Sequence, residues 1–202
     1  MSRANEPCRG RRRDARAAPR GCTPRRAGTL VAAAAAVAVM ATARAPGAAP
    51  AIVWNVSASV PTGLYRVRPL PPPVAAMVAV GMLVVVRPPE PLAAFLAEGH
   101  YLPRGVPLIK PVLAIAGQTV CRARAVVTVD GREAGVARTR DGRGHPLPAW
   151  EGCRTIAGDE VFLMNAAEPS SLDGRYFGPL SLSAIAGRAE PLLTFTASVA
   201  AD

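Results

Sequence analysis

The chain has 202 residues and a formal net charge of +10, with 24 lysines and arginines against 14 aspartates and glutamates. This length accommodates one domain with a tail and excludes two large domains. The charge alone does not predict a nucleic-acid binder, because a basic tail and a basic face have different functions.

Most of the positive charge lies in an N-terminal tail. Residues 1–28 hold nine arginines against Glu6 and Asp14, a net of +7, so only +3 remains for the rest of the chain. Such an arm would attract phosphates in a salt-dependent manner. Because an uncharged apolar run follows it directly, we interpret the arm as a membrane-topology signal and expect no nucleic-acid partner.

The apolar run at residues 27–43 is rich in alanine and ends before Arg44. At about 1.5 Å per residue it spans roughly 25 Å, slightly less than the ~30 Å hydrocarbon core of a bilayer. It is predicted to be a single transmembrane anchor in the plasma (inner) membrane, although Ala41-Thr42-Ala43 also resembles a signal cleavage site. The positive-inside rule then places the tail, residues 1–26, in the cytoplasm and the following domain in the periplasm or outside the cell.

Residues 44–50 form a small Pro- and Gly-containing spacer, and the domain is predicted to occupy residues 51–202. Short β-type runs separated by Pro and Gly clusters predict a mostly β domain; they cover residues 77–87, 120–129, 160–164 and 192–195. The pair Asp130-Gly131 favours a two-residue hairpin turn. Twenty-one prolines argue against long helices, and residues 91–98 are the best helix candidate.

Lys110 is the one lysine in the sequence, whereas arginine supplies the rest of the positive charge. Its neighbours on both sides are apolar, which predicts burial. Burial lowers the pKa of a lysine and can make it a base near neutral pH, which arginine cannot become. The alternative is an edge-strand lysine that extends its ammonium to water.

Two further stretches carry groups that could work with such a base. Residues 55–65 contain Ser57 and Ser59 ahead of Pro61 and Gly63, where a turn would expose a hydroxyl and converge backbone N–H groups. Residues 170–179 place a serine beside an acid and an arginine. Taken separately, these stretches are also typical of an ordinary loop and of a polar turn with a weak surface ion pair.

Together, in this order and behind an N-terminal anchor, the three stretches resemble the signal peptidase S26 family, and within it the TraF-like peptidases of conjugative transfer. The resemblance covers roughly Trp54 to Leu193. Its most specific piece is Ser-Leu-Asp-Gly-Arg-Tyr-Phe-Gly-Pro at residues 171–179. The resemblance implies a signal-peptidase-type β domain with a Ser/Lys dyad.

The family resemblance also implies a role for each matching residue. Ser59 would be the nucleophile and Lys110 its general base. Ser57 would help the nucleophile's own N–H to bind the oxyanion, and Ser171 would orient the lysine amine. A supporting ion pair would be formed by Asp173 and Arg175.

The sequence departs from the family pattern in three places. Ala116-Gly117-Gln118 replaces Pro-Gly-Asp, Val60 stands where methionine is common, and Gly174 replaces a serine. These departures concern the fine positioning of the site groups.

The cysteines and histidines indicate a disulfide and no metal site. Cys8 and Cys22 lie in the tail, so the predicted topology leaves one pairing, Cys121 with Cys153. The two histidines are isolated, and the sequence predicts no metal, no cofactor and no Ser-His-Asp triad.

The predicted function is that of a membrane-anchored serine endopeptidase that removes signal or leader segments from exported precursors. A pilin precursor of conjugation is the expected substrate, which would make the conjugative transfer machinery a partner. The alternatives are a general signal peptidase for secreted preproteins and a non-catalytic anchored subunit of pilus assembly.

Overall fold

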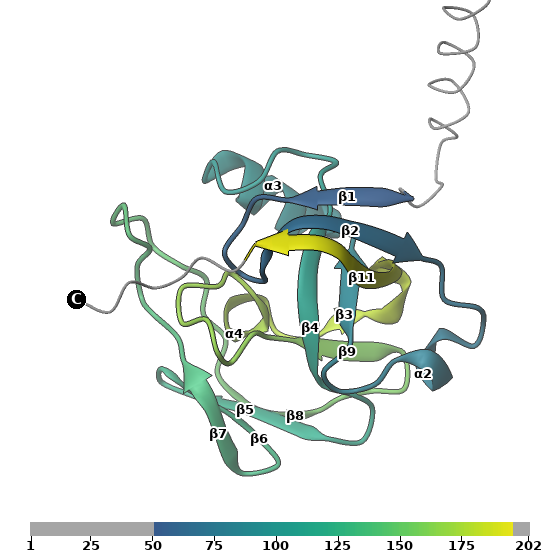
Figure 1. Ribbon diagram of the computed structural model, residues 1–202. Helices are drawn as coiled ribbons and strands as arrows, with labels where there is room; N and C mark the ends of the chain where they lie inside the picture. Colours follow the sequence, from purple (N-terminus) through teal and green to yellow (C-terminus); the bar gives the residue numbers. More distant parts are fainter. Residues whose placement is uncertain (1–50, 196–202) are drawn as a thin grey trace, which may run out of the picture. The chain divides into compact units, whose positions relative to one another are not determined.

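The computed structural model describes residues 51–195, which form a mostly β domain with short helices (Figure 1). The predicted mostly β class is confirmed. The described residues contain no helix that is long and apolar enough to span a membrane. The predicted tail (1–26), anchor (27–43) and spacer (44–50) lie outside the described residues.

The larger of the two sheets has seven strands, all paired antiparallel, in the order β1-β2-β11-β3-β4-β9-β10. Its strands are β1 (Ile52–Asn55), β2 (Thr62–Arg68), β3 (Leu83–Val86), β4 (Leu108–Ala114), β9 (Glu160–Leu163), β10 (Leu180–Ser181) and β11 (Ile185–Phe195). The C-terminal strand β11 pairs with β2 on one side and with β3 on the other. It therefore joins the first hairpin of the domain to the strands that follow.

The smaller sheet has four strands in the order β7-β6-β5-β8 (Figure 1). They are β5 (Thr119–Ala123), β6 (Val126–Val129), β7 (Arg132–Val136) and β8 (Gly152–Thr155). Asp130 and Gly131 connect β6 to β7 with φ angles of 49° and 78°. Both positive values fit the predicted two-residue hairpin turn, which is confirmed.

Two of the predicted β runs do not form one continuous strand. The run 120–129 is a hairpin rather than one strand, because Arg124 turns the chain with a φ of 56° between β5 and β6. The run 77–87 is a strand only over β3. Its first residue ends the short helix α2 (Val74–Met77), and Gly81, with a φ of 85°, lies in the turn that follows.

The remaining helical elements are short. The predicted helix is confirmed as α3 (Glu90–Glu98), which has Pro91 in its first turn. Helix α4 (Gly174–Phe177) and the 3₁₀ turn η1 (Leu182–Ala184) flank β10. Leu92 and Leu96 of α3 are buried.

Three clusters of buried apolar side chains form the core of the domain. One lies between β2, β3, β4 and β11, and a second lies among β3, β4 and β9. The third is shared by the two sheets and contains Ala114, Val120, Val127 and Phe162. Strand β4 contributes to all three clusters, so close packing fixes its buried side chains.

Cys121 of β5 and Cys153 of β8 lie directly opposite each other in the smaller sheet and form a disulfide bond. The bond joins residues 32 positions apart in the sequence. It fastens β8, whose residues are all exposed, to the rest of the sheet.

Candidate active site

Lys110 lies in the middle of β4, opposite Val84 of β3, and only 4% of its surface is exposed. Burial lowers the pKa of its amine from 10.5 to about 8; the negative charge of Asp173 opposes this shift, and the positive charge of Arg175 adds to it. The alternative of an exposed lysine that reaches water is therefore wrong. A substantial fraction of neutral amine is available at mildly alkaline pH.

Two serine hydroxyls surround the lysine amine. Nζ of Lys110 lies 2.8 Å from Oγ of Ser59 and 2.8 Å from Oγ of Ser171. The two hydroxyl oxygens are 3.3 Å apart. Ser59 is half-buried and Ser171 is buried. The geometry thus places a hydroxyl that a substrate can reach beside an amine and a second hydroxyl that are both shielded from water.

Ser59 lies in the loop of residues 56–61, which connects β1 to β2 and which we call the nucleophile loop. The buried amide of Asn55 organises this loop. Its Nδ2 donates to the carbonyl oxygens of Ser57, Val60 and Pro61 at 2.8, 3.0 and 3.1 Å. These bonds replace the strand pairing that the loop lacks and give Ser59 a defined backbone position.

Gly63 closes the nucleophile loop at the start of β2. Its φ is 139°, and a Cβ atom built there would lie 2.1 Å from the carbonyl oxygen of Leu193 in β11. A side chain at this position would force β2 and β11 apart, so glycine is required next to the loop.

Ser57 has a contact that sequence reasoning did not anticipate. Its hydroxyl donates a hydrogen bond of 3.0 Å to Oδ1 of Asn55, which also accepts one of 3.2 Å from the Ser57 N–H. Within residues 51–195, no hydrogen bond joins Ser57 to Ser59. A role of the Ser57 hydroxyl in binding an oxyanion therefore requires this hydroxyl to turn away from Asn55.

Asp173 and Arg175 form a buried ion pair, with side chains that are 0% and 1% exposed and 2.8 Å between Oδ1 and Nε. The reading of this stretch as a surface turn is wrong. The guanidinium also donates to the carbonyl oxygens of Asn165, Glu168 and Pro169 at 2.6, 3.1 and 3.2 Å. The ion pair thereby holds the loop of residues 165–171, which ends at Ser171.

Gly174 explains one departure from the family pattern. A Cβ atom at this position would lie 2.7 Å from the carbonyl oxygen of Leu163 and 2.8 Å from the ring of Phe162. The start of α4 packs so closely on β9 that it leaves no room for the side chain of the serine found in the family motif. In this chain, glycine allows α4 to approach the sheet and keep Arg175 buried.

Sequence reasoning missed two amide side chains. Asn55 is the first residue of the stretch 55–65 described above, and the tendency of asparagine to bond the backbone of nearby residues is the signal that could have identified it. Asn165 donates a hydrogen bond of 2.6 Å from Nδ2 to the carbonyl oxygen of Ser59. No local sequence signal points to Asn165, because its partner is 106 residues away.

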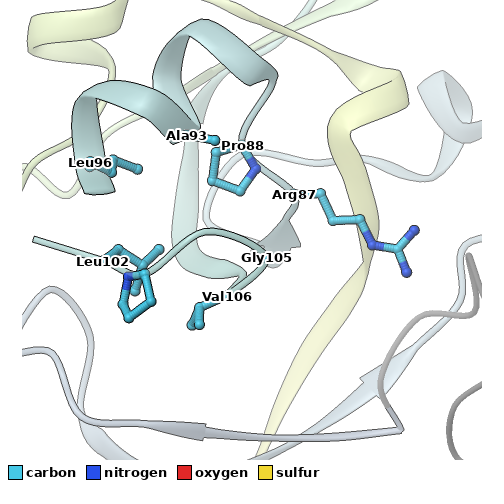
Figure 2. A pocket seen from close by; sticks show the side chains of 8 residues that line it. Arg87, Pro88, Ala93, Leu96, Leu102, Gly105 and Val106 are labelled. Carbon is cyan, nitrogen blue, oxygen red and sulfur yellow. The ribbon is translucent and has the colours of Figure 1, made fainter. Parts of the chain in front are cut away.

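An apolar cavity of about 390 Å³ lies beside α3 (Figure 2). Ala93, Leu96, Leu102 and Val106 line it, while the Arg87 guanidinium points away from the space that these side chains surround. None of the six predicted site residues lines this cavity. In the described part of the chain there is also no cluster of three or more His, Cys, Asp or Glu side chains suited to a metal ion.

Comparisons with known proteins identify the family to which the chain belongs. The model of the family described as signal peptidase, peptidase S26, matches residues 26–193. A probable conjugal transfer protein TraF of Sinorhizobium fredii (strain NBRC 101917 / NGR234) is 36% identical over 151 residues, which are 70% of this chain and 76% of that protein. A plasmid transfer protein TraF of Escherichia coli is 32% identical over 177 residues, which are 84% of this chain and 95% of that protein.

A conjugal transfer protein TraF of Agrobacterium fabrum (strain C58 / ATCC 33970) is also similar, with 36% identity over 152 residues, 70% of this chain and 81% of that protein. Among solved structures, a signal peptidase I from Enterococcus faecalis V583 aligns with a TM-score of 0.33 and 13% identity, covering 55% of this chain and 95% of the other.

Proposed function

Because this chain belongs to the signal peptidase S26 family and is close to its TraF members, we propose that it is a serine endopeptidase in which Ser59 and Lys110 form the catalytic dyad. The observation that carries the proposal is the placement of a buried lysine amine within 2.8 Å of the hydroxyls of both Ser59 and Ser171. A purely structural lysine would not be expected to remain buried without a carboxylate in direct contact.

Acylation begins when the neutral amine of Lys110 accepts the proton of Ser59 as Oγ attacks the scissile carbonyl carbon. The Ser59 N–H and, in this proposal, the Ser57 hydroxyl donate hydrogen bonds that stabilise the negative charge on the carbonyl oxygen of the tetrahedral intermediate. The lysine ammonium then gives its proton to the leaving amine as the C–N bond breaks. An ester between the substrate and Ser59 remains.

Deacylation repeats these steps with water in place of the serine hydroxyl. Neutral Lys110 accepts a proton from the water that attacks the ester, and the ammonium returns a proton to Ser59 Oγ as the C–O bond breaks. Throughout the cycle the Ser171 hydroxyl accepts a hydrogen bond from the amine. It therefore keeps the nitrogen directed toward Ser59 in both charge states.

The proposed substrate is an exported precursor with an N-terminal signal or leader segment. The relatives are named as conjugal or plasmid transfer proteins, which favours a pilin precursor of a transfer system over general secretory preproteins. In this proposal the basic tail stays in the cytoplasm, residues 27–43 anchor the chain in the inner membrane, and the catalytic domain faces the periplasm.

The test is cleavage by the purified full chain in detergent of two substrates, a conjugative pilin precursor and a secretory preprotein, with the products identified by mass spectrometry. We expect cleavage of the pilin precursor, no turnover by Ser59→Ala, and no turnover by Lys110→Arg, since guanidinium cannot accept the serine proton near neutral pH. Normal turnover by either variant would exclude the dyad.

The same experiment separates the alternative functions. Faster cleavage of the preprotein than of the pilin precursor would favour a general signal peptidase. Failure of the wild-type chain to cleave either substrate, together with failure of Ser59 to react with a fluorophosphonate, would favour a non-catalytic subunit of pilus assembly.

A further inference from the structure

The amide of Asn165 links the nucleophile to the residues that follow β9, the strand that pairs with the lysine-bearing strand β4. We infer, on the basis of the proposed function, that Asn165 is a positioning residue that sets the separation between Ser59 and Lys110. Its Nδ2 donates to the Ser59 carbonyl oxygen at 2.6 Å, so it acts on the backbone of the nucleophile and touches none of the reacting atoms.

Strand pairing does not fix the distance between the two members of the dyad. Ser59 lies in the nucleophile loop, outside the strands, and Lys110 lies in β4. Two strands, β11 and β3, separate β2 from β4 in the sheet. Other contacts must therefore hold the nucleophile loop at hydrogen-bonding distance from the lysine amine.

Three described hydrogen bonds connect the nucleophile loop to the side of the site that carries the base. Two of them end on Ser59 Oγ, one from Lys110 and one from Ser171. Both are disrupted when this oxygen attacks the substrate and becomes an ester. The bond from Asn165 ends on the Ser59 carbonyl, which takes no part in bond making, so it persists through the whole cycle.

Apolar packing supplements this hydrogen bond without replacing it. Val60 belongs to the same buried cluster as Ile109, the neighbour of Lys110, so the nucleophile loop and β4 share one part of the core. Packing lacks the direction of a hydrogen bond, however, and leaves the orientation of Ser59 open.

Both polar backbone groups of Asn165 are hydrogen-bonded. Its N–H donates to Oδ2 of Asp173 at 3.1 Å, and its carbonyl oxygen accepts from Nη2 of Arg175 at 2.6 Å. The side-chain Oδ1 accepts from the N–H of Ala167 at 3.0 Å, which directs Nδ2 toward Ser59. The buried ion pair that supports Ser171 thus also supports the residue that aligns the nucleophile.

The experiment compares kcat for each active site in the wild type, Asn165→Ala and the isosteric Asn165→Asp, with sites counted by fluorophosphonate labelling of Ser59. We expect both variants to lose about 10- to 100-fold in kcat per labelled site, with KM changed by less than about threefold, because a misplaced nucleophile affects reaction more than binding. Asn165→Asp retains the shape of the side chain but lacks the donor. In Asn165→Ala, the pH at which the rate is half-maximal should match the wild type.

Ser170→Ala is the matched control, because Ser170 is exposed in the same loop and its hydroxyl donates to Glu168. It should react like the wild type. A merely structural role of Asn165 would lower the number of labelled sites and the unfolding temperature but leave kcat per site unchanged, and that result would overturn the inference. If the wild type itself fails to react at Ser59, the proposed function fails and this inference fails with it.

Discussion

Lys110 and Ser171, residues that are 4% and 2% exposed, are joined by a side-chain hydrogen bond of 2.8 Å. The hydroxyl satisfies one N–H of the amine without adding a negative charge that would keep the lysine protonated. A carboxylate in the same place would raise the pKa of Lys110 and weaken it as a base near neutral pH. The buried serine thus preserves both the orientation and the basicity of the amine.

The first prediction concerns the pH dependence of the reaction. The folded pKa of Lys110 is lowered to about 8, so about a tenth of the molecules hold the neutral amine at pH 7. The rate should rise nearly tenfold per pH unit below this value and level off above it. Labelling of Ser59 by a fluorophosphonate between pH 6 and 9.5 measures this profile. A rate that is flat or falls over this range would contradict the role of Lys110 as a neutral base.

A second prediction concerns the Ser57 hydroxyl. If it turns from Asn55 to bind the oxyanion, Ser57→Ala should lower kcat by on the order of 10²–10³ with little change in KM. The Ser57 N–H still donates to Oδ1 of Asn55 in this variant, so the nucleophile loop should keep its conformation. A decrease in kcat of only a few-fold would instead assign the hydroxyl to the support of Asn55.

A third prediction tests the buried ion pair. Asp173→Ala leaves the guanidinium of Arg175 buried without its carboxylate, and we expect the free energy of unfolding to fall by about 3–5 kcal/mol. The control is Glu190→Gln, which removes the carboxylate of the exposed pair with Arg68 and should cost no more than about 1 kcal/mol. Urea unfolding of both variants gives the comparison, and equal losses would show that burial does not strengthen the pair.

Local chemistry accounts for the parts of the fold and site that the sequence predicted. The turn at Asp130-Gly131 needs only its own two residues to adopt positive φ. The burial of Lys110 follows from its apolar neighbours. The role of Ser59 rests on the family resemblance, because a serine ahead of a proline and a glycine is also an ordinary loop.

The features that the sequence did not predict depend on contacts between distant residues. The run 192–195 marks only the end of β11, because Arg188 and Glu190 interrupt the apolar pattern of a strand that pairs on both sides. Asp173 and Arg175 appear in sequence as a polar turn, and only the packing of α4 on β9 buries them. The contact between Asn165 and Ser59 exists only in the folded domain.

A fourth prediction concerns the disulfide. In the chain-entropy model, a cross-link between residues 32 positions apart contributes about 3–4 kcal/mol to the free energy of unfolding. The double variant Cys121→Ser, Cys153→Ser should lose this amount in urea unfolding. Its kcat per labelled site should match the wild type at 25 °C, because no described hydrogen bond joins either cysteine side chain to the dyad. A large loss of kcat in a folded variant would contradict this separation.

The last prediction joins stability to the proposed function through Lys110. Its pKa in the folded protein, about 8, lies below the ordinary value of 10.5 that applies to the unfolded chain. Between these values the unfolded state binds more protons, so the contribution of Lys110 to the free energy of unfolding becomes more favourable as pH rises from about 8 toward 10.5. Below pH 8 the buried ammonium destabilises the folded state by about 3 kcal/mol relative to the neutral amine.

Lys110→Met removes this contribution while keeping a side chain of similar length in the core. We therefore expect the free energy of unfolding of the wild type, minus that of Lys110→Met, to increase by about 2–3 kcal/mol between pH 7 and pH 10. The raised pKa values of Tyr65 and Tyr101 affect both proteins alike and cancel in the difference. Urea unfolding of the two proteins at pH 7, 8, 9 and 10 measures it. A difference that stays constant over this range would mean that the pKa of Lys110 is not lowered in the folded protein. The neutral-base mechanism would then lose its physical basis.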